Sequence, residues 1–162
     1  MDKYDRIIVS QLAANARTSA AEIAGLAHLS RSAVTRRIQA LEDKGTLCGY
    51  HAVLSHERLG WSVEALVTLR APSYEHKRVI EEILVCPEVV SLRILSGASH
   101  YLVEAVFLNT SHMRDFVRGI QRFGETETHV VFDCHRSTRT VAERLQHFEK
   151  WATREGDSRE RD

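Results

Sequence analysis

The stretch LSRSAVTRRIQALEDKG, residues 29–45, decides the fold of the N-terminal part of this chain. Ser30 can cap the start of a helix, because its hydroxyl oxygen accepts a hydrogen bond from a free amide of the first turn. Gly45 can end that helix, since glycine adopts the left-handed backbone conformation at little cost. The apolar residues that recur between them at helical spacing are Val34, Ile38 and Leu41. The stretch therefore predicts a helix with one buried face.

The other face of this helix is polar and basic. It carries Ser32, Thr35, Arg36 and Gln39 at helical spacing, with Arg31 at the first turn and Arg37 beside them. No acidic residue lies between residues 30 and 39. Arginines on an amphipathic helix most often form a surface that is only solvated, and this is the first interpretation. The second is that the arginines bind DNA. A helix that is buried on one side and basic on the other is suited to the major groove of DNA.

The residues before this helix favour the DNA interpretation. Ser19 and Glu22 have the spacing of a capping box, in which each side chain accepts a hydrogen bond from the backbone amide of the other residue. A short helix would follow, and residues 28–29 leave only a tight connection into the next helix. A short helix, a tight turn and a second helix with a basic face form a helix-turn-helix unit. Glycine is common in such a turn and is absent from this one.

A series of motifs spans the first third of the chain almost without a gap. They are Asp2-x-x-Asp5-x-x-Ile8, Arg17-x-Ser19, Glu22-Ile23-Ala24, Leu29-Ser30, Val34-x-x-Arg37-Ile38-x-x-Leu41-Glu42 and Gly45-x-Leu47-x-Gly49-Tyr50. This pattern resembles the N-terminal domain of the Lrp/AsnC regulators, the leucine-responsive or feast/famine transcription factors of bacteria and archaea. The resemblance implies a sequence-specific DNA-binding transcriptional regulator.

Seven residues of the basic helix are the expected contacts with double-stranded DNA. Those expected at base edges are Arg31, Ser32, Thr35 and Arg36. Ser30, Arg37 and Gln39 are expected to hold phosphates, which contribute affinity but carry no sequence information. Dimers would place two such helices in successive major grooves, so that half-sites lie one turn or a multiple of it apart.

Beyond residue 61 the apolar pattern changes from helical to extended. The expected strands are residues 62–70, 89–96, 101–108 and 126–134, and the expected helices are residues 74–85 and 111–120, the second capped by Ser111. The order β-α-β-β-α-β is the ferredoxin-like split motif, with both helices on one face of an antiparallel sheet. The resemblance implies that sheet faces pair into homodimers, which assemble into a larger oligomer, often an octamer.

We therefore expect an α+β fold, with an N-terminal winged helix-turn-helix followed by a ferredoxin-like βαββαβ effector and dimerisation domain. A first helix, capped by Asp2, would pack behind the helix pair. The expected segments are a DNA-binding domain at residues 1–50, a linker strand at 51–61, the effector-binding and oligomerisation domain at 62–136, a C-terminal helix at 137–154 and a disordered tail at 155–162.

The resemblance also implies a small effector, usually an amino acid, bound in clefts between effector domains. The corresponding residues here are Ser96, Gly97, Ala98, Ser99, His100 and Tyr101 in the hairpin loop, and Thr126 and Thr128 at the entry to the last strand. The usual loop has the pattern G-D-x-D-Y, and Ala98 and His100 replace both acidic residues. A different amino acid, a ligand without an amine and no small ligand therefore all stay open.

The sequence gives no sign of a metal site, a cofactor or an enzyme. The cysteines, Cys48, Cys86 and Cys134, share no ligand spacing, and the nine histidines are spread singly along the chain. The formal net charge is zero, and residues 1–52 carry 7 Lys+Arg against 5 Asp+Glu. No apolar run reaches the length of a membrane span, and the N-terminus lacks a signal-peptide pattern. We expect a cytoplasmic protein.

One enzymatic alternative shares this architecture. Siroheme decarboxylases resemble these regulators and use histidines and arginines of the effector-domain cleft to handle a tetrapyrrole and its carboxylates. His100, His129 and Arg93 are the residues that could take such a role. The intact basic helix argues against it, because an enzyme has no physical reason to keep a DNA-binding face.

Overall fold

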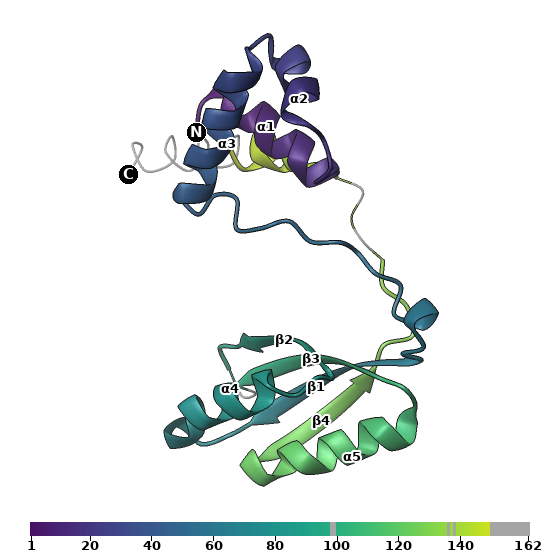
Figure 1. The fold of residues 1–162 in the computed structure, drawn as a ribbon. Helices are drawn as coiled ribbons and strands as arrows, with labels where there is room; N and C mark the ends of the chain where they lie inside the picture. The colour runs from purple at the N-terminus through teal and green to yellow at the C-terminus, as the bar shows by residue number, and fades with distance from the viewer. Residues whose placement is uncertain (98–99, 136, 138, 150–162) are drawn as a thin grey trace. The chain divides into compact units, whose positions relative to one another are not determined.

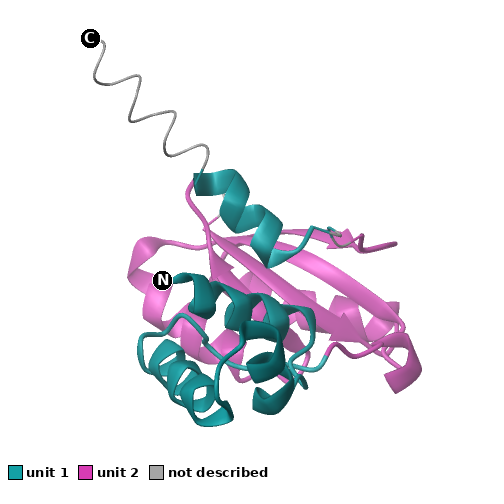
Figure 2. Cartoon of the chain, turned by 90° about the horizontal axis from the view of Figure 1, so that it is seen from above, with its two compact units in different colours: residues 1–52, 136–162 teal, residues 53–135 magenta. Residues whose placement is uncertain are grey.

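The computed structural model describes residues 1–97, 100–135, 137 and 139–149, and the chain divides into two compact units (Figure 2). We call residues 1–52 together with those from 136 onward the helical unit, and residues 53–135 the sheet unit. Figure 1 labels the helices and strands of both units. In the described part of the chain, no helix is both long enough and apolar enough to cross a membrane.

Three helices open the helical unit: α1 (Lys3–Ala14), α2 (Ala20–Ala27) and α3 (Arg31–Asp43). Each follows a residue whose side chain accepts hydrogen bonds from first-turn amides, and these predicted caps, Asp2, Ser19 and Ser30, are confirmed. The helices bury one core, which consists of Ile8, Leu12, Ile23, Ala24, Val34 and Leu41. The predicted stripe on α3 is thus part of this core, with Ile38 packed at its edge.

The turn between α2 and α3 is made without glycine. His28 follows α2 with a φ of 52°, in the left-handed region, and its amide donates to the carbonyl of Ala24. Few residues other than glycine adopt this conformation, because the Cβ then approaches the backbone. The tight connection predicted for residues 28–29 is confirmed, and a histidine takes the place that glycine often has.

Residues 44–62, between α3 and the first strand, form no paired strand. α3 ends at Asp43, and Gly45 adopts a φ of 67°, in agreement with its predicted role in ending the helix. Residues 46–54, expected as an extended wing and linker, contain a bend at residues 46–47 followed by chain without regular secondary structure. A short 3-10 helix, Glu57–Leu59, comes before the first strand.

The sheet unit has the predicted element order. Its elements are β1 (Val63–Arg70), α4 (His76–Leu84), β2 (Val89–Ile94), β3 (Tyr101–Phe107), α5 (Thr110–Ile120) and β4 (Glu125–Val130). The strands lie in the order β2-β3-β1-β4, and every neighbouring pair is antiparallel. This is the split βαβ arrangement, so the ferredoxin-like prediction is confirmed.

Several element ends differ from the prediction: α4 and β2 are each shorter than expected, and two differences have a visible cause. The cap of α5 is Asn109 rather than Ser111, because the Asn109 side chain accepts from the amide of His112. The last strand ends at Val130 rather than at residue 134. Val130 is paired with Ala65 near the start of β1, so the chain beyond residue 131 runs past the end of its partner strand.

The alternation of side chains along β1 separates the two faces of the sheet. Ala65, Val67 and Leu69 are fully buried against α4 and α5, which lie on one side of the sheet in Figure 1. Leu66 lies on the opposite face, which we call the open face. The sequence left undecided which of these residues turn away from the helices, and the structure assigns Leu66.

Gly124 is the position where the sheet unit leaves no room for a side chain. It joins the 3-10 helix Gln121–Phe123 to β4 with a φ of 155°. A Cβ atom at this position would lie 1.9 Å from the carbonyl oxygen of Arg70 at the end of β1. Since that oxygen belongs to the backbone, only a shift of the chain could relieve the overlap.

Gly124→Ala should therefore lower the free energy of unfolding by about 1–3 kcal/mol, through backbone strain and overpacking. Urea unfolding of the full chain measures the change. Gly119→Ala on α5 is the matched control, because a Cβ there meets nothing within 4 Å. It should instead add about 0.5–1 kcal/mol through helix propensity. Equal effects of the two substitutions would contradict the close approach at Gly124.

Candidate functional site

The polar face of α3 is open to solvent. Six of the seven residues expected at DNA are exposed, and they are Ser30, Arg31, Ser32, Thr35, Arg36 and Gln39. The seventh, Arg37, is half-buried. The opposite face carries the fully buried Val34, so the helix is fixed with these polar residues outward. Their contact with DNA stays a prediction.

Local hydrogen bonds order the uncharged members of this face. The Ser30 hydroxyl accepts from the amide of Ala33 at 3.2 Å, and the Thr35 hydroxyl donates to the Arg31 carbonyl at 3.1 Å. Gln39 donates its side-chain amide to Asp43 at 3.0 Å. Arg31 and Arg36 form no ion pair within the described residues, so their guanidinium groups are the available positive charges of the face.

Arg37 is engaged within the unit. Its Nη1 donates to Oδ2 of Asp2 and to Oδ1 of Asp5, each at 2.7 Å. Its guanidinium carbon lies 5.3 Å from the centroid of the Tyr4 ring. The hydrogen bonds with Asp5 and then Asp2 raise the pKa of Arg37, while partial burial acts in the opposite direction. The sequence contains both acidic residues, but nothing local assigns them to an arginine more than 30 positions away.

The predicted effector loop is described in part. Ser96 and Gly97 are exposed, whereas Ala98 and Ser99 lie outside the described residues. His100 is half-buried, and its Nδ1 lies 2.6 Å from the carbonyl oxygen of Ala71. Because a carbonyl only accepts hydrogen bonds, Nδ1 must carry the proton of this contact.

Tyr101 belongs to the core rather than to an exposed loop. Its side chain is only 2% exposed, and burial raises the pKa of its hydroxyl. That hydroxyl lies 2.8 Å from Nδ1 of His76, at the start of α4. The sequence did not single out His76, because no spacing pattern connects it with residue 101.

Two hollows adjoin His100. The larger one, of about 560 Å³, is lined by Arg70, Ala71, Pro72, His100, Gln121, Arg122, Phe123, Gly124 and Glu125. The smaller one, of about 240 Å³, is lined by Ser73, His76, Ile94, Leu95, His100 and Tyr101. His100 and Tyr101 both line the smaller hollow, and their contact with an effector stays a prediction. Thr126 and Thr128 lie half-buried on β4 and line neither hollow; the Thr126 hydroxyl accepts from Gln121 at 3.2 Å.

The residues proposed for tetrapyrrole chemistry are not gathered. Arg93 lies on β2 opposite Leu102, and His129 lies on β4 opposite Leu66. Two strands separate β2 from β4, which corresponds to about 14 Å at the usual strand spacing. His100 is held at Ala71. Nowhere among the described residues do three or more His, Cys, Asp or Glu side chains form a group that could hold a metal ion.

A further helix, residues 141–149, belongs to the helical unit. Thr140 and Glu143 close its first turn as a capping box, in which each side chain accepts from the amide of the other residue. These hydrogen bonds lower the pKa of Glu143. At the other end Glu149 forms an ion pair with Arg6 of α1. The first turn of this helix is therefore capped locally, and its ion pair connects the helix to α1.

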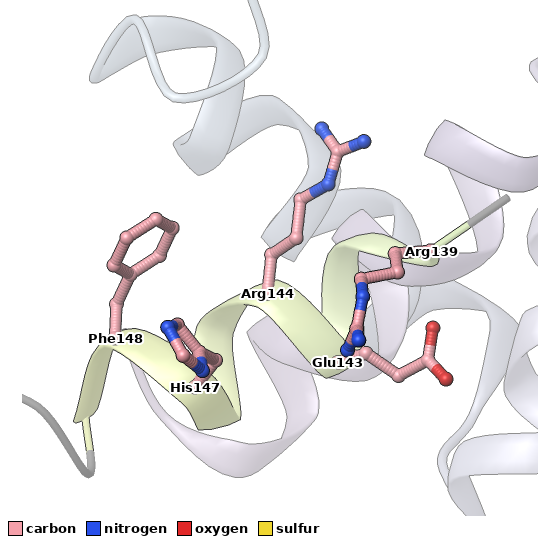
Figure 3. A pocket seen from close by; sticks show the side chains of 5 residues that line it. All are labelled: Arg139, Glu143, Arg144, His147 and Phe148. Carbon is pink, nitrogen blue, oxygen red and sulfur yellow. The ribbon is translucent and has the colours of Figure 1, made fainter. Parts of the chain in front are cut away.

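The C-terminal helix faces α1 with an apolar stripe formed by Val141 and Leu145. Both residues are half-buried, whereas Phe148 is 63% exposed. Hollows of about 150 and 390 Å³ lie between the two helices, and Ser10 lines both. Figure 3 shows another hollow, of about 500 Å³, whose lining side chains from Arg139 to Phe148 all come from this segment.

Comparisons with known proteins agree with both units. An AsnC-type helix-turn-helix domain matches residues 1–42, and an Lrp/AsnC ligand binding domain matches residues 64–149. The HTH-type transcriptional regulator YezC of Bacillus subtilis is 29% identical over 138 residues, covering 83% of this chain and 98% of that protein. The HTH-type transcriptional regulator LrpC of the same organism is 25% identical over 132 residues, covering 82% and 92%.

Solved structures give the same result. The leucine response regulatory protein LrpA of Mycobacterium tuberculosis is 28% identical, with a TM-score of 0.72 over 86% of this chain and 97% of that one. LrpC of Bacillus subtilis is 24% identical and shows the same fold, with a TM-score of 0.78 over 86% of this chain and 99% of that one. These relatives are regulators, and they give no support to the siroheme decarboxylase alternative.

The docking of the C-terminal helix can be tested at Leu145. Leu145→Ala removes half-buried apolar contacts with α1, so local opening of this helix should cost about 1–2 kcal/mol less, a smaller loss than for a fully buried leucine. Hydrogen exchange at the amides of residues 141–149 and of α1 measures the change. Phe148→Ala, on the exposed side, should leave exchange unchanged. Equal protection in the two variants would show that the helix is not held by this stripe.

Proposed function

The chain belongs to the Lrp/AsnC family of transcriptional regulators, and from that premise we propose how it recognises DNA and its ligand. Like its relatives it is an HTH-type regulator with a ligand-binding domain. The observation that carries the proposal is the face of α3, where Arg31 and Arg36 stand exposed beside a buried stripe. We propose that α3 lies in the DNA major groove.

Within this proposal the contacts divide by chemistry. Arg31, Ser32, Thr35 and Arg36 contact base edges, where arginine binds guanine and hydroxyl groups accept or donate. Ser30 and Gln39, at the ends of the exposed face, hold phosphates and set the register of the helix. We also propose a cytoplasmic location, because the regulators of this family occur in bacteria and archaea, whose DNA lies in the cytoplasm. We assign it no enzymatic role.

We further propose a homodimer built through the open face of the sheet. Leu66 and Leu102 lie half-buried on that face in the single chain, where α4 and α5 give no cover. Pairing of two such faces would remove these apolar residues from water, and dimers would assemble into a larger oligomer such as an octamer. Two α3 helices per dimer then match half-sites one turn of DNA apart or a multiple of it.

An amino acid is the effector that we propose for the larger hollow beside His100. Its wall carries charges of both signs: the guanidinium group of Arg70 lies 3.9 Å from the Glu125 carboxylate, and that of Arg122 forms an ion pair with Glu82. A zwitterion with a carboxylate and an ammonium group complements such a wall. The loop residues Ser96 and Gly97 are exposed and do not line this hollow, and Ala98 and Ser99 lie outside the described residues; their contact with the effector stays a prediction.

The DNA contact is tested by Arg36→Ala and Arg31→Ala. Each should cost about 1–3 kcal/mol of binding on the specific site and relax specificity at one base pair. Fluorescence anisotropy on DNA from upstream of the protein's own gene and on random DNA, as a salt series, measures both effects. Arg118→Ala on α5 is the control, since it removes the same charge from the sheet unit. Equal weakening on every DNA sequence would make these arginines phosphate contacts.

The ligand is tested in the same titration with a panel of amino acids and their des-amino analogues. The matching amino acid should shift the DNA-binding midpoint, and Glu125→Gln should weaken that shift about two- to fivefold, as expected for an exposed charge pair. Glu81→Gln on α4 is the matched control, because Glu81 does not line the hollow. A shift by the des-amino acids alone would identify a ligand without an amine, and no shift at all would remove the small effector.

A further inference from the structure

The first turn of α1 is closed by two carboxylates at once. Oδ1 of Asp2 accepts from the amides of Tyr4 and Asp5, at 2.8 and 2.9 Å. In return Oδ2 of Asp5 accepts from the amide of Asp2 at 3.1 Å. Acidic side chains suit this place, because the helix N-terminus presents free amides and a partial positive charge.

The second oxygen of each carboxylate binds Arg37. Oδ2 of Asp2 and Oδ1 of Asp5 each accept from Nη1 of Arg37 at 2.7 Å. Each acid therefore uses one oxygen for the backbone of α1 and the other for the side chain of α3. We call Asp2, Asp5 and Arg37 the carboxylate clamp. Its charged hydrogen bonds are of the short, strong kind.

Partial burial makes the clamp more than a surface ion pair. The side chain of Asp5 is 19% exposed and that of Arg37 is 33% exposed, and Tyr4 lies under the guanidinium group. The pKa of Asp2 is lowered, chiefly by the hydrogen bond from the amide of Asp5 and also by Arg37, against the effect of burial. Asp2 is thus held ionised at the point where α3 meets the start of α1.

Arg36 and Arg37 are consecutive residues with different surroundings. Arg36 is exposed and has no ion pair in the described part of the chain, whereas both protons of one Arg37 nitrogen are taken by carboxylates. For Arg37 to bind a phosphate, it would have to leave two acids, and those acids would then repel the phosphate. The cost of that exchange separates the roles of the two arginines.

We propose that Arg37 is a positioning residue, which fixes the direction of α3 through the carboxylate clamp, and that it is not a phosphate contact. The clamp ties the middle of α3 to the N-terminus of α1 and so sets where Arg31, Thr35 and Arg36 point. This inference rests on the proposed function, because it takes α3 as the helix that enters DNA. It replaces the phosphate role that the sequence predicted for Arg37.

Asp5→Asn gives the sharpest test, because the two roles predict opposite results. The substitution removes a negative charge and weakens the hold on Arg37. If Arg37 positions α3, the ratio of affinities for specific and random DNA should fall about tenfold, the size of one lost base contact. If Arg37 binds phosphate, its release should strengthen binding to every DNA sequence and leave that ratio unchanged, which would overturn the proposal.

Two matched controls accompany this variant. Glu42→Gln removes one negative charge from α3 itself, at a residue that bonds the Tyr50 hydroxyl and not the clamp, and it should keep the ratio. Ile8→Val loosens the shared core of α1 without touching the clamp, and at a temperature where all variants are folded by circular dichroism it should also keep the ratio. A fall in the ratio for Ile8→Val equal to that for Asp5→Asn would overturn the proposal, because general loosening would then explain both.

Arg37→Gln supplies a second, independent readout. For a positioning residue the ratio falls while the slope of log affinity against log salt concentration is kept. For a phosphate contact the slope falls by about one and the loss is equal on all sequences. In the double variant Asp5→Asn/Arg37→Gln, the ratio of affinities for specific and random DNA should fall no further than in Arg37→Gln alone, since both substitutions remove the same interaction. If the wild-type protein does not prefer its own upstream DNA, the proposed function fails together with this inference; a wild-type preference that both variants keep overturns the inference alone.

Discussion

The burial of one side of α3 is the constraint on which the rest of the helical unit depends. Val34 is fully buried and Leu41 nearly so, and with 3.6 residues per turn these contacts fix the rotation of the helix about its axis. Thr35 and Arg36 then point outward, on the side of the helix away from the core. Core packing fixes this rotation, and the hydrogen bonds of Arg37 add a second, polar connection between α3 and the start of α1.

α1 contacts the core of the helical unit, α3 and the C-terminal helix. It supplies Ile8 and Leu12 to the core, Asp2 and Asp5 to Arg37, and Arg6 to the ion pair with Glu149. The C-terminal helix and α3 are thus both held by α1. Because residues 131–140 lead directly from β4 to this C-terminal helix, the helical unit is joined to the sheet unit by two stretches of chain rather than one.

The sequence predictions that the structure confirms are mostly those based on local rules. The caps Asp2, Ser19 and Ser30 and the element order of the sheet unit depend on residues three or four apart, or on the period of apolar residues, and these signals lie within the sequence itself. The roles of Arg37 and Gly124 depend on partners distant in sequence. Arg37 meets acids 32 and 35 positions away, and Gly124 is constrained by the backbone of residue 70. The face taken by Leu66 was undecidable, because its neighbours on β1 are apolar as well.

The charge of the chain bears on how specificity can arise. The whole chain is formally neutral, and residues 1–52 hold a small positive excess of 7 Lys+Arg over 5 Asp+Glu. With Arg37 bound to two carboxylates, the face of α3 presents Arg31 and Arg36 as its exposed charges. Non-specific affinity grows with the number of phosphates neutralised, so a single copy has little hold on DNA of arbitrary sequence. Several linked copies multiply affinity only where each α3 meets its half-site in the right direction. Because α3 carries few exposed charges and has a fixed direction, its binding depends more on contacts with bases than on the neutralisation of phosphates.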